Sequence, residues 1–423
     1  MSKRVVVIGA GVIGLMCAHY LRQRDLEVVV IDREGAERAT ASYGNAGMIV
    51  PSHFVPLAAP GVVAQGIRWM ANPKSPFYVR PRLSADLIAW AWRFWRAGTA
   101  RRVRRSAPLL LALNLASRDE YVALVKGLGE DVGLERRGLS MLCATQKGLD
   151  DEAGVVELAH ELGARAEVLD ARGVKALEPD IDLSVVGGVH FPDDAHLDPG
   201  RLMRAMQRSL AAGGVEFEFG CEVTGFTTRA ESVVGVNVRR ARGEVDTILG
   251  DEFVLAAGAW SGLLARTIGL ELPMQPGKGY STTLEDPPQR LRVPSILAEA
   301  RVAVTPLGGR LRVGGTMELN GFDPRENETR ILGIVESTLE YFPSLSTADF
   351  RGEWWHGFRP CSPDGLPYLG RTQRHENVIV AAGHGMMGVS LAPVTGKIVA
   401  ELVAEAPPSI SVGSLSPDRY GRA

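Results

Sequence analysis

Short apolar runs alternate with helical stretches at the start of the chain. Val5–Ile8 and Val28–Ile31 are uninterrupted runs of β-branched residues, which is typical of strands buried on both faces of a parallel sheet. The residues between them have the apolar spacing of a helix. The pattern therefore predicts a strand–helix–strand unit.

Further elements are predicted from the period of the hydrophobic residues, from residues that cap helices, and from the glycines and prolines that end helices. Helices are expected at 84–96, 108–126, 151–162, 198–212, 326–341 and 388–404. Strands are expected at 215–219, 233–238, 245–249, 253–257, 301–305, 310–315 and 378–382. The stretch 51–81, which is rich in proline and glycine, is expected to be irregular.

The turn after the first apolar run carries three spaced glycines, Gly9, Gly11 and Gly14. The first allows a tight turn, the second lets backbone N–H groups approach a pyrophosphate, and the third lets helix and strand pack closely. The helix N-terminus adds partial positive charge, and Asp32, which ends the second run, can accept hydrogen bonds from a ribose. This combination predicts a Rossmann-type site for an adenine dinucleotide.

A secretory signal peptide is the alternative interpretation of this segment, because Lys3 and Arg4 precede an apolar stretch. The spaced glycines and the second strand favour the nucleotide site. No uninterrupted apolar run reaches the roughly 18 residues of a spanning helix, so none is expected.

Composition narrows the remaining classes of protein. The length of 423 residues suits two interleaved domains, and the net charge of −2 gives no general attraction to nucleic acid. The four cysteines are far apart without a CxxC pair, and the histidines show no HExxH or other clustered ligand pattern. We therefore expect no metal, no disulfide framework and a cytoplasmic location.

Charge gathers in one segment, 68–105, which holds ten Lys or Arg and a single acid, Asp86. Aromatic residues are interleaved with these charges, and a helix after Ser84 would place Leu87, Ile88, Ala91 and Trp95 near one face. Two interpretations stay open. The segment could make peripheral contact with an anionic membrane, on the inner face of the cytoplasmic membrane, or it could be an ordinary helix with solvated arginines.

A second strand–glycine loop–helix occurs near the C-terminus. The strand at 378–382 leads into Gly383-His384-Gly385-Met386-Met387-Gly388, which opens a helix. A helix N-terminus of this kind suits an electron-rich group.

These motifs resemble the flavoprotein amine oxidoreductases related to D-amino acid oxidase and glycine oxidase, and within them the bacterial D-amino acid dehydrogenases. The likeness covers essentially the whole chain. It rests on VVVIGAGVIG, VVVIDRE, SYGNAGMIVPS, APGV with IRWM, HLDPGRL, KGYS, RVGGTME, GFRPCSPDGLPYLGR and AAGHGMMGVSLAPVTGK. The resemblance implies an α/β fold, in which a Rossmann-type FAD-binding domain (1–50, 150–270 and 355–423) is interleaved with an α+β, mixed-sheet substrate-binding domain (51–149 and 271–354).

The resemblance also implies which residues hold FAD. Val223 matches a position whose backbone meets the adenine, and Gly258 and Trp260 lie where the family closes over the cofactor. The remaining FAD-binding residues would be Gly9, Gly11, Val12, Ile13, Gly14, Asp32, Arg33, Ser42, Asn45, Ala46, Gly47, Met48, Gly385, Met386, Met387, Gly388 and Val389. Gly357 stands where a covalent flavin cysteine occurs in the sarcosine oxidase branch, and Cys361 is offset, so FAD is expected to be non-covalent.

The substrate site is expected around Arg359, which matches the arginine that holds a substrate carboxylate in this superfamily. A guanidinium binds a carboxylate through two hydrogen bonds and stays charged at any working pH. Tyr280 is expected to contact the substrate, with an interior strand tyrosine as the alternative. His53 is expected in the pocket, or else on a solvated loop, and His384 near the flavin, or else in a structural role.

The implied reaction is oxidation of D-amino acids by hydride transfer from Cα to flavin N5. The imino acid product is hydrolysed to a 2-oxo acid and ammonia, and the electrons pass to a quinone or another respiratory acceptor. The alternatives are a D-hydroxyproline or D-proline dehydrogenase, which oxidises a cyclic imino acid, a glycine/sarcosine-type oxidase, and a redox-silent FAD-binding module.

Overall fold

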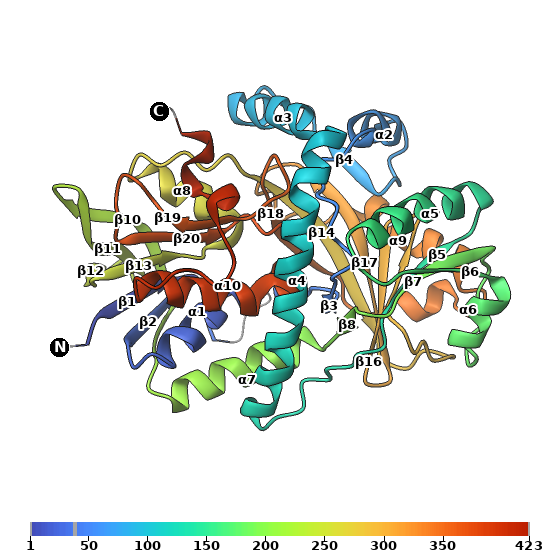
Figure 1. Cartoon of the computed structure of the whole chain (residues 1–423), viewed down its shortest axis with the longest axis horizontal. Helices are drawn as coiled ribbons and strands as arrows, with labels where there is room; N and C mark the ends of the chain where they lie inside the picture. Colours follow the sequence, from blue (N-terminus) through green and yellow to red (C-terminus); the bar gives the residue numbers. More distant parts are fainter. Residues whose placement is uncertain (1, 37–39, 422–423) are drawn as a thin grey trace.

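Two sheets lie side by side in the computed structural model, which describes residues 2–36 and 40–421 (Figure 1). The first sheet has six strands in the order β19-β20-β13-β1-β2-β9, all parallel except the edge strand β19. Its strands are β1 (Arg4–Ile8), β2 (Glu27–Asp32), β9 (Glu216–Phe219), β13 (Glu252–Leu255), β19 (Tyr368–Arg371) and β20 (Val378–Ala382). The predicted strand–helix–strand unit is confirmed as its centre.

Both faces of this sheet are covered, which explains the continuous apolar runs. Val5 and Val7 pack against helices, whereas Val6 and Ile8 pack against a three-stranded sheet on the other face. The helices are α1 (Val12–Arg22), α7 (Pro199–Ala212) and α10 (Gly388–Val403), and the small sheet is β10 (Cys221–Arg229), β11 (Ser232–Arg240) and β12 (Val245–Leu249).

The second sheet has nine strands and is mixed. The order is β18-β14-β17-β16-β15-β5-β7-β6, with β4 paired to β17. The strands are β4 (Phe77–Val79), β5 (Leu139–Cys143), β6 (Glu167–Asp170), β7 (Gly187–Phe191), β14 (Gln275–Leu284), β15 (Ser295–Leu297), β16 (Val302–Leu307), β17 (Arg310–Leu319) and β18 (Trp355–Cys361). This arrangement of a parallel sheet beside a mixed one is the predicted fold class.

Helices and short elements complete the chain. With the second sheet lie α5 (Gln146–Glu161), α6 (Ala171–Leu177) and α9 (Glu328–Tyr341). The other elements are α2 (Val62–Met70), α3 (Ala85–Ala97), α8 (Ser261–Arg266), the strand pair β3 (Met48–Ile49) and β8 (Ala195–His196), and the 3-10 turns η1 (Gly258–Trp260), η2 (Thr347–Phe350), η3 (Gly413–Leu415) and η4 (Pro417–Tyr420). In the described ranges, no helix has both the length and the apolar character needed to cross a bilayer.

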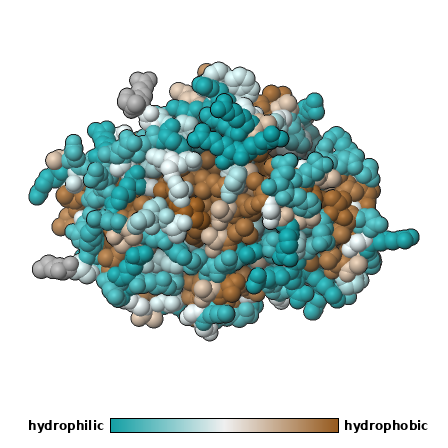
Figure 2. All heavy atoms as spheres, in the orientation of Figure 1, coloured by the Kyte–Doolittle hydropathy of each residue, from teal (hydrophilic) through white to brown (hydrophobic). Residues whose placement is uncertain are grey.

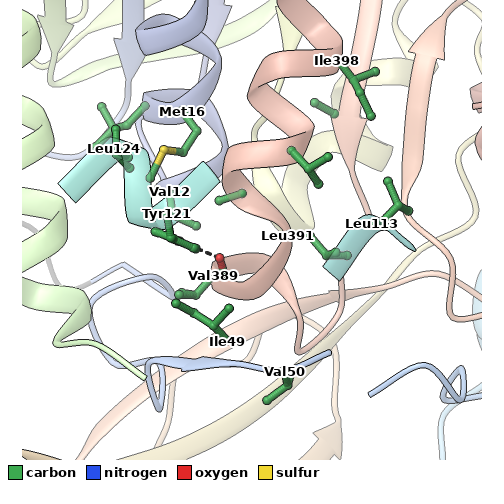
Figure 3. Close-up of a cluster of buried hydrophobic side chains, with 14 of the residues drawn as sticks. Val12, Met16, Ile49, Val50, Leu113, Tyr121, Leu124, Val389, Leu391 and Ile398 are labelled. Atoms are coloured by element: carbon green, nitrogen blue, oxygen red, sulfur yellow. Dashed lines mark hydrogen bonds between the residues drawn. The ribbon is translucent and has the colours of Figure 1, made fainter. Parts of the chain in front are cut away.

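The helix α4 (Ala100–Leu128) runs between the part of the molecule that holds the six-stranded sheet and the part that holds the nine-stranded sheet (Figure 1). Its buried residues Leu113, Tyr121 and Leu124 belong to the main hydrophobic cluster, and the Tyr121 hydroxyl donates to the Val389 carbonyl at 2.7 Å (Figure 3). The predicted start at 108 is wrong. Thr99 caps the helix by accepting from the Arg102 amide, and the proline lies inside it.

The region 51–105 also differs from the sequence-based expectation. The stretch 51–81 contains α2 and β4 and is therefore not wholly irregular. Ser84 caps α3 as predicted, but its buried residues are Leu87, Trp90 and Ala97. Ile88 and Trp95, which were expected to share the face of Leu87, are exposed.

The ranges predicted for the two domains differ from the sheet pairing at two places. Strands β6 and β7 fall in the range 150–270 and β18 falls in 355–423, yet all three pair in the nine-stranded sheet. An alternating pattern shows that a strand has a buried face, but it does not show which sheet the strand joins.

Candidate active site

A cavity of about 1610 Å³ is lined by residues of both the six-stranded and the nine-stranded sheet. This volume exceeds the roughly 300–1,000 Å³ of a pocket for one drug-sized ligand, so it has room for a dinucleotide and a second molecule. Every predicted site residue lines the cavity except Gly14 and Gly47. In the part of the chain that the structure describes, no group of three or more His, Cys, Asp or Glu could hold a metal.

The glycine loop between β1 and α1 forms one end of the cavity. Gly9 has a φ of +105°, which glycine adopts without strain. A Cβ on Gly14 would stand 1.8 Å from the Gly9 carbonyl oxygen, so this glycine lets the helix approach the strand and does not face the cavity. Gly11 is the N-cap of α1 without a side chain, and a Cβ there would find only ordinary contact with Ser42. The loop is thus open toward a phosphate group.

The carboxylate of Asp32 is fixed at the end of β2. Its oxygens accept hydrogen bonds from the amides of Ala10 at 2.7 Å and Glu34 at 2.9 Å. Asp32 also lines the cavity, so the remaining lone pairs of its carboxylate are available to accept from a ribose.

An aromatic wall closes the cavity beside this end. The Arg33 guanidinium lies 3.8 Å from the Trp260 ring centroid, and Trp260 stacks on Phe322 at 4.9 Å. Gly258 reaches a φ of +55° just before, which turns the chain after β13 toward the wall. Val223, on β10, also lines the cavity.

The loop 42–47 is held under the middle of the cavity. The Ser42 hydroxyl accepts from the Val12 amide at 3.0 Å, and Asn45 Oδ1 accepts from the Gly47 amide at 2.8 Å. Arg312, which the sequence did not single out, donates to the carbonyls of residues 43 and 45 at 2.8 and 2.9 Å. Gly47 shapes the turn with a φ of +77° rather than lining the cavity.

The C-terminal glycine loop forms the opposite wall. Gly383 and Gly385 have φ values of +77° and +56°, and the Gly385 amide donates to the Pro360 carbonyl at 3.0 Å. This contact joins the loop before α10 to strand β18. His384 Nε2 lies 3.0 Å from the Thr395 hydroxyl, and burial lowers the pKa of this histidine to about 3. It is therefore neutral and held within the protein.

Arg359 projects from β18 into the cavity, close to this loop. Its Nη1 donates to the Thr316 carbonyl at 2.6 Å, and burial lowers its pKa. A Cβ on Gly279 would lie 2.1 Å from Nη1, so the missing side chain makes room for the guanidinium. Within the described residues no carboxylate forms an ion pair with Arg359. A charged fork on a cavity wall without an internal anion is suited to an anion from outside.

Thr316, which supports Arg359, is in a strained conformation. Its φ is +65°, a left-handed value that is rare for a β-branched residue. The pairing of β14 with β17 is irregular between Lys278 and Tyr280, next to this position. The strain therefore lies where the carbonyl meets the guanidinium. Thr316 and Gly279 lie within the motifs RVGGTME and KGYS, but the sequence alone did not show their roles, because both roles depend on pairing across the sheet.

The two other predicted substrate residues have different environments. Tyr280 lines the cavity, but its hydroxyl donates to buried Glu318 at 3.1 Å. His53 lines the cavity with Nδ1 3.0 Å from the Ser52 hydroxyl, which in turn bonds Asp194. Burial, and then the charge of Arg301, lower the pKa of His53 to about 4, so its ring is neutral at pH 7.

Comparison with known proteins agrees with this geometry. The family described as FAD dependent oxidoreductase (DAO) matches residues 4–402. The D-amino acid dehydrogenases of Granulibacter bethesdensis and Rhizorhabdus wittichii are 35% and 33% identical to the chain. The alignments cover 99% of this chain with 99% of the first relative, and 99% with 100% of the second.

Solved structures share the fold. Glycine oxidase from Geobacillus kaustophilus superposes with a TM-score of 0.77 at 24% identity, covering 99% of both chains. L-proline dehydrogenase from P. horikoshii gives a TM-score of 0.74 at 19% identity, covering 99% of this chain and 98% of that one. The open glycine loop and the fixed Asp32 fit the phosphates and ribose of FAD. The chain therefore belongs to the family of FAD-dependent oxidoreductases.

Proposed function

We propose that the protein oxidises the Cα–N bond of D-amino acids to imino acids, which water hydrolyses to 2-oxo acids and ammonia. The observation that carries the proposal is Arg359, a charged fork that faces the cavity and has no ion-pair partner among the described residues. The full-length similarity to relatives named D-amino acid dehydrogenase supports the choice of substrate class.

The chain's own residues bind and orient the substrate. Arg359 would hold the carboxylate through two hydrogen bonds, while the Thr316 carbonyl keeps the guanidinium in place. His53, being neutral, can accept a hydrogen bond from the amine. Holding the substrate at two points fixes Cα for reaction.

FAD is held in this proposal by the two glycine loops and the loop 42–47, without a covalent bond. When bound, FAD accepts a hydride from Cα at N5. Cys361 is not suited to a covalent bond, because burial raises the pKa of its thiol to about 11 and its Sγ lies 3.5 Å from the Arg359 carbonyl. The amides at the start of α10 would stabilise negative charge on the ring.

The electrons pass to a quinone or another respiratory acceptor in this proposal, and the segment 68–105 makes peripheral contact with a membrane. Exposed aromatic and basic side chains on α3 and at the start of α4 support that contact.

Replacing Arg359 tests the substrate assignment. The variant Arg359→Gln should lower kcat/KM for D-amino acids about 10–100-fold, the loss expected for a charged hydrogen bond. Arg359→Lys keeps the charge but loses the forked pair of donors, so its kcat/KM should lie between that of Arg359→Gln and that of the wild type. The matched control is the corresponding amine without a carboxylate, whose slow oxidation the Gln variant should leave unchanged. If the variant and wild type discriminate equally between amino acid and amine, Arg359 does not bind the carboxylate.

A further inference from the structure

The cavity has an apolar arm beneath α2 and α3. Among the described lining residues on α2, β4 and α3, one polar side chain occurs, that of Gln65, and none is charged. The opposite end of the cavity, at the β10–β11 hairpin, is lined by Glu34, Glu222 and Arg239. The two ends therefore suit ligands of different polarity.

This arm connects the surface with the strand that carries Arg359. Ile67 on α2 and Ile88 on α3 both line the cavity, although they are 66% and 63% exposed, so the arm opens between these helices. Deeper in, buried Trp90 stacks on Phe94 at 5.0 Å and donates from Nε1 to the Cys361 carbonyl at 2.9 Å. Strand β18 thus forms part of the inner end of the arm.

The surface around the opening is aromatic and basic. Trp92 and Trp95 are exposed with ring centroids 5.1 Å apart, and Leu83 is fully exposed. Hydrophobic atoms lie among hydrophilic ones along this upper edge of the molecule (Figures 1 and 2). Asp86, the segment's single acid, is paired with Arg266 at 2.8 Å. Six exposed arginines form no ion pair within the described ranges: 68, 96, 101, 102, 104 and 105.

We propose that this arm is the access path of a lipid-soluble quinone, taken up from an anionic bilayer on which the mouth between α2 and α3 rests. The inference rests on the proposed function, to which it adds the site and the route of the electron acceptor. Exposed tryptophans and unpaired arginines complement the interface and headgroups of such a bilayer. An aromatic, uncharged wall suits a neutral ring.

An amino acid is a poor occupant of the same arm. Its ammonium and carboxylate would have to leave water in a passage that offers them no charged partner. Another part of the lining offers the amino acid a more polar path into the cavity, toward Arg359. There, half-exposed Arg301 lies 3.7 Å from buried Glu152, and both residues face the cavity.

With the amino acid and the quinone as substrates, electrons and atoms balance in the reaction. The amino acid gives up two electrons and two protons in total, and the quinone takes up both to become a quinol. Water supplies the oxygen of the 2-oxo acid, and the nitrogen leaves as ammonium.

Narrowing the mouth of the arm tests its role. Ala91 is exposed and lines the cavity, whereas Ala85 on the same helix is exposed and does not. The flavin is first reduced with dithionite, without any amino acid, and is then reoxidised by a short-chain ubiquinone in detergent-free buffer. In Ala91→Trp the rate of this reoxidation should be about tenfold lower than in the wild type, which corresponds to about 1.4 kcal/mol. The rate of reoxidation by ferricyanide in Ala91→Trp should match that of the wild type. In Ala85→Trp, the rates with ubiquinone and with ferricyanide should both match the wild type. Equal ubiquinone rates in both variants would overturn the proposal.

Anaerobic reduction by a D-amino acid separates the arm from the substrate path. Ala91→Trp should be reduced as fast as the wild type, and slower reduction would assign the arm to the amino acid instead. If no amino acid reduces the wild type, the proposed function fails, but the dithionite experiment still tests the arm.

Binding to vesicles tests the membrane part without measuring activity. The wild type should co-sediment with mixed phosphatidylcholine and phosphatidylglycerol vesicles and less with phosphatidylcholine alone. Replacing Arg101, Arg102, Arg104 and Arg105 by Glu should abolish the difference. If this variant binds as the wild type does, the mouth does not rest on an anionic bilayer.

Discussion

Arg359 reaches the cavity because of a glycine on the neighbouring strand. The register of β14 and β18 places Gly277 opposite Arg359, and the guanidinium then lies over Gly279, two residues further along β14. The sequence predicted Arg359 from its motif. It could not predict Gly279 or Thr316, because no local pattern gives the register between strands so far apart in the chain.

A methyl group at Gly279 should displace the guanidinium without unfolding the protein, since the atom that it meets is the end of a flexible side chain. We expect Gly279→Ala to raise KM for D-amino acids about 10–100-fold while the flavin spectrum stays unchanged. Gly225→Ala is the matched control, because a Cβ on this strand glycine meets only ordinary contacts. Steady-state kinetics measure both variants. An unchanged KM in Gly279→Ala would show that the position of Arg359 is not critical.

Asp194 is a second residue that the sequence did not reveal. It is buried beneath the loop of His53, and burial raises the pKa of its carboxyl to about 8. The unfolded chain releases this proton near pH 4, whereas the folded protein keeps it until about pH 8. The contribution of this carboxyl to the free energy of unfolding is therefore fully present below about pH 4. It is lost as the pH rises from about 4 to about 8.

The variant Asp194→Asn mimics the protonated acid and should remove this pH dependence. At pH 7 we expect a gain in unfolding free energy on the order of 4 kcal/mol over the wild type, shrinking toward zero near pH 4. Denaturant titrations across this range measure the difference. A gain that is constant with pH would mean that Asp194 is ionised in the folded protein.

At the scale of elements, local patterns predicted the strand–loop–helix units at both ends of the chain. The spaced glycines, caps and apolar runs that specify β1, α1, β20 and α10 lie within each unit. The sheet membership of β6, β7 and β18 was missed, because it depends on contacts between distant segments. The start of α4 was missed because Pro108 resembled a first-turn proline.

The two glycines at the start of α1 should respond differently to the same substitution. A Cβ on Gly14 meets backbone that cannot move away, so Gly14→Ala should destabilise the protein without FAD by about 1–3 kcal/mol or more. Gly11→Ala meets only Ser42 at 3.5 Å, so it should leave that stability unchanged and weaken FAD binding. Thermal unfolding of the FAD-free protein and FAD titration separate the two effects. Equal destabilisation by both would contradict this division of roles.

At the scale of the whole molecule, the two sheets act through one shared cavity. The six-stranded sheet contributes the glycine loops, and the nine-stranded sheet contributes Arg359 and its support. The charged end of the cavity lies beside Asp32 and Val223, where the ribose and adenine of FAD would bind, and the apolar arm lies on the other side. The sequence indicated the basic and aromatic segment, but its relation to the cavity depends on how α2 and α3 pack over β4 and β18.

The most direct test of the proposed function is the visible spectrum of the purified protein without oxygen, recorded with D- and L-amino acids and D-hydroxyproline. We expect several D-amino acids to bleach the flavin band and their L-enantiomers to leave it unchanged. Bleaching by the ring amine alone would restrict the substrate to cyclic amino acids. A flavin band that no amine bleaches would contradict the assignment of this cavity to amino acid oxidation.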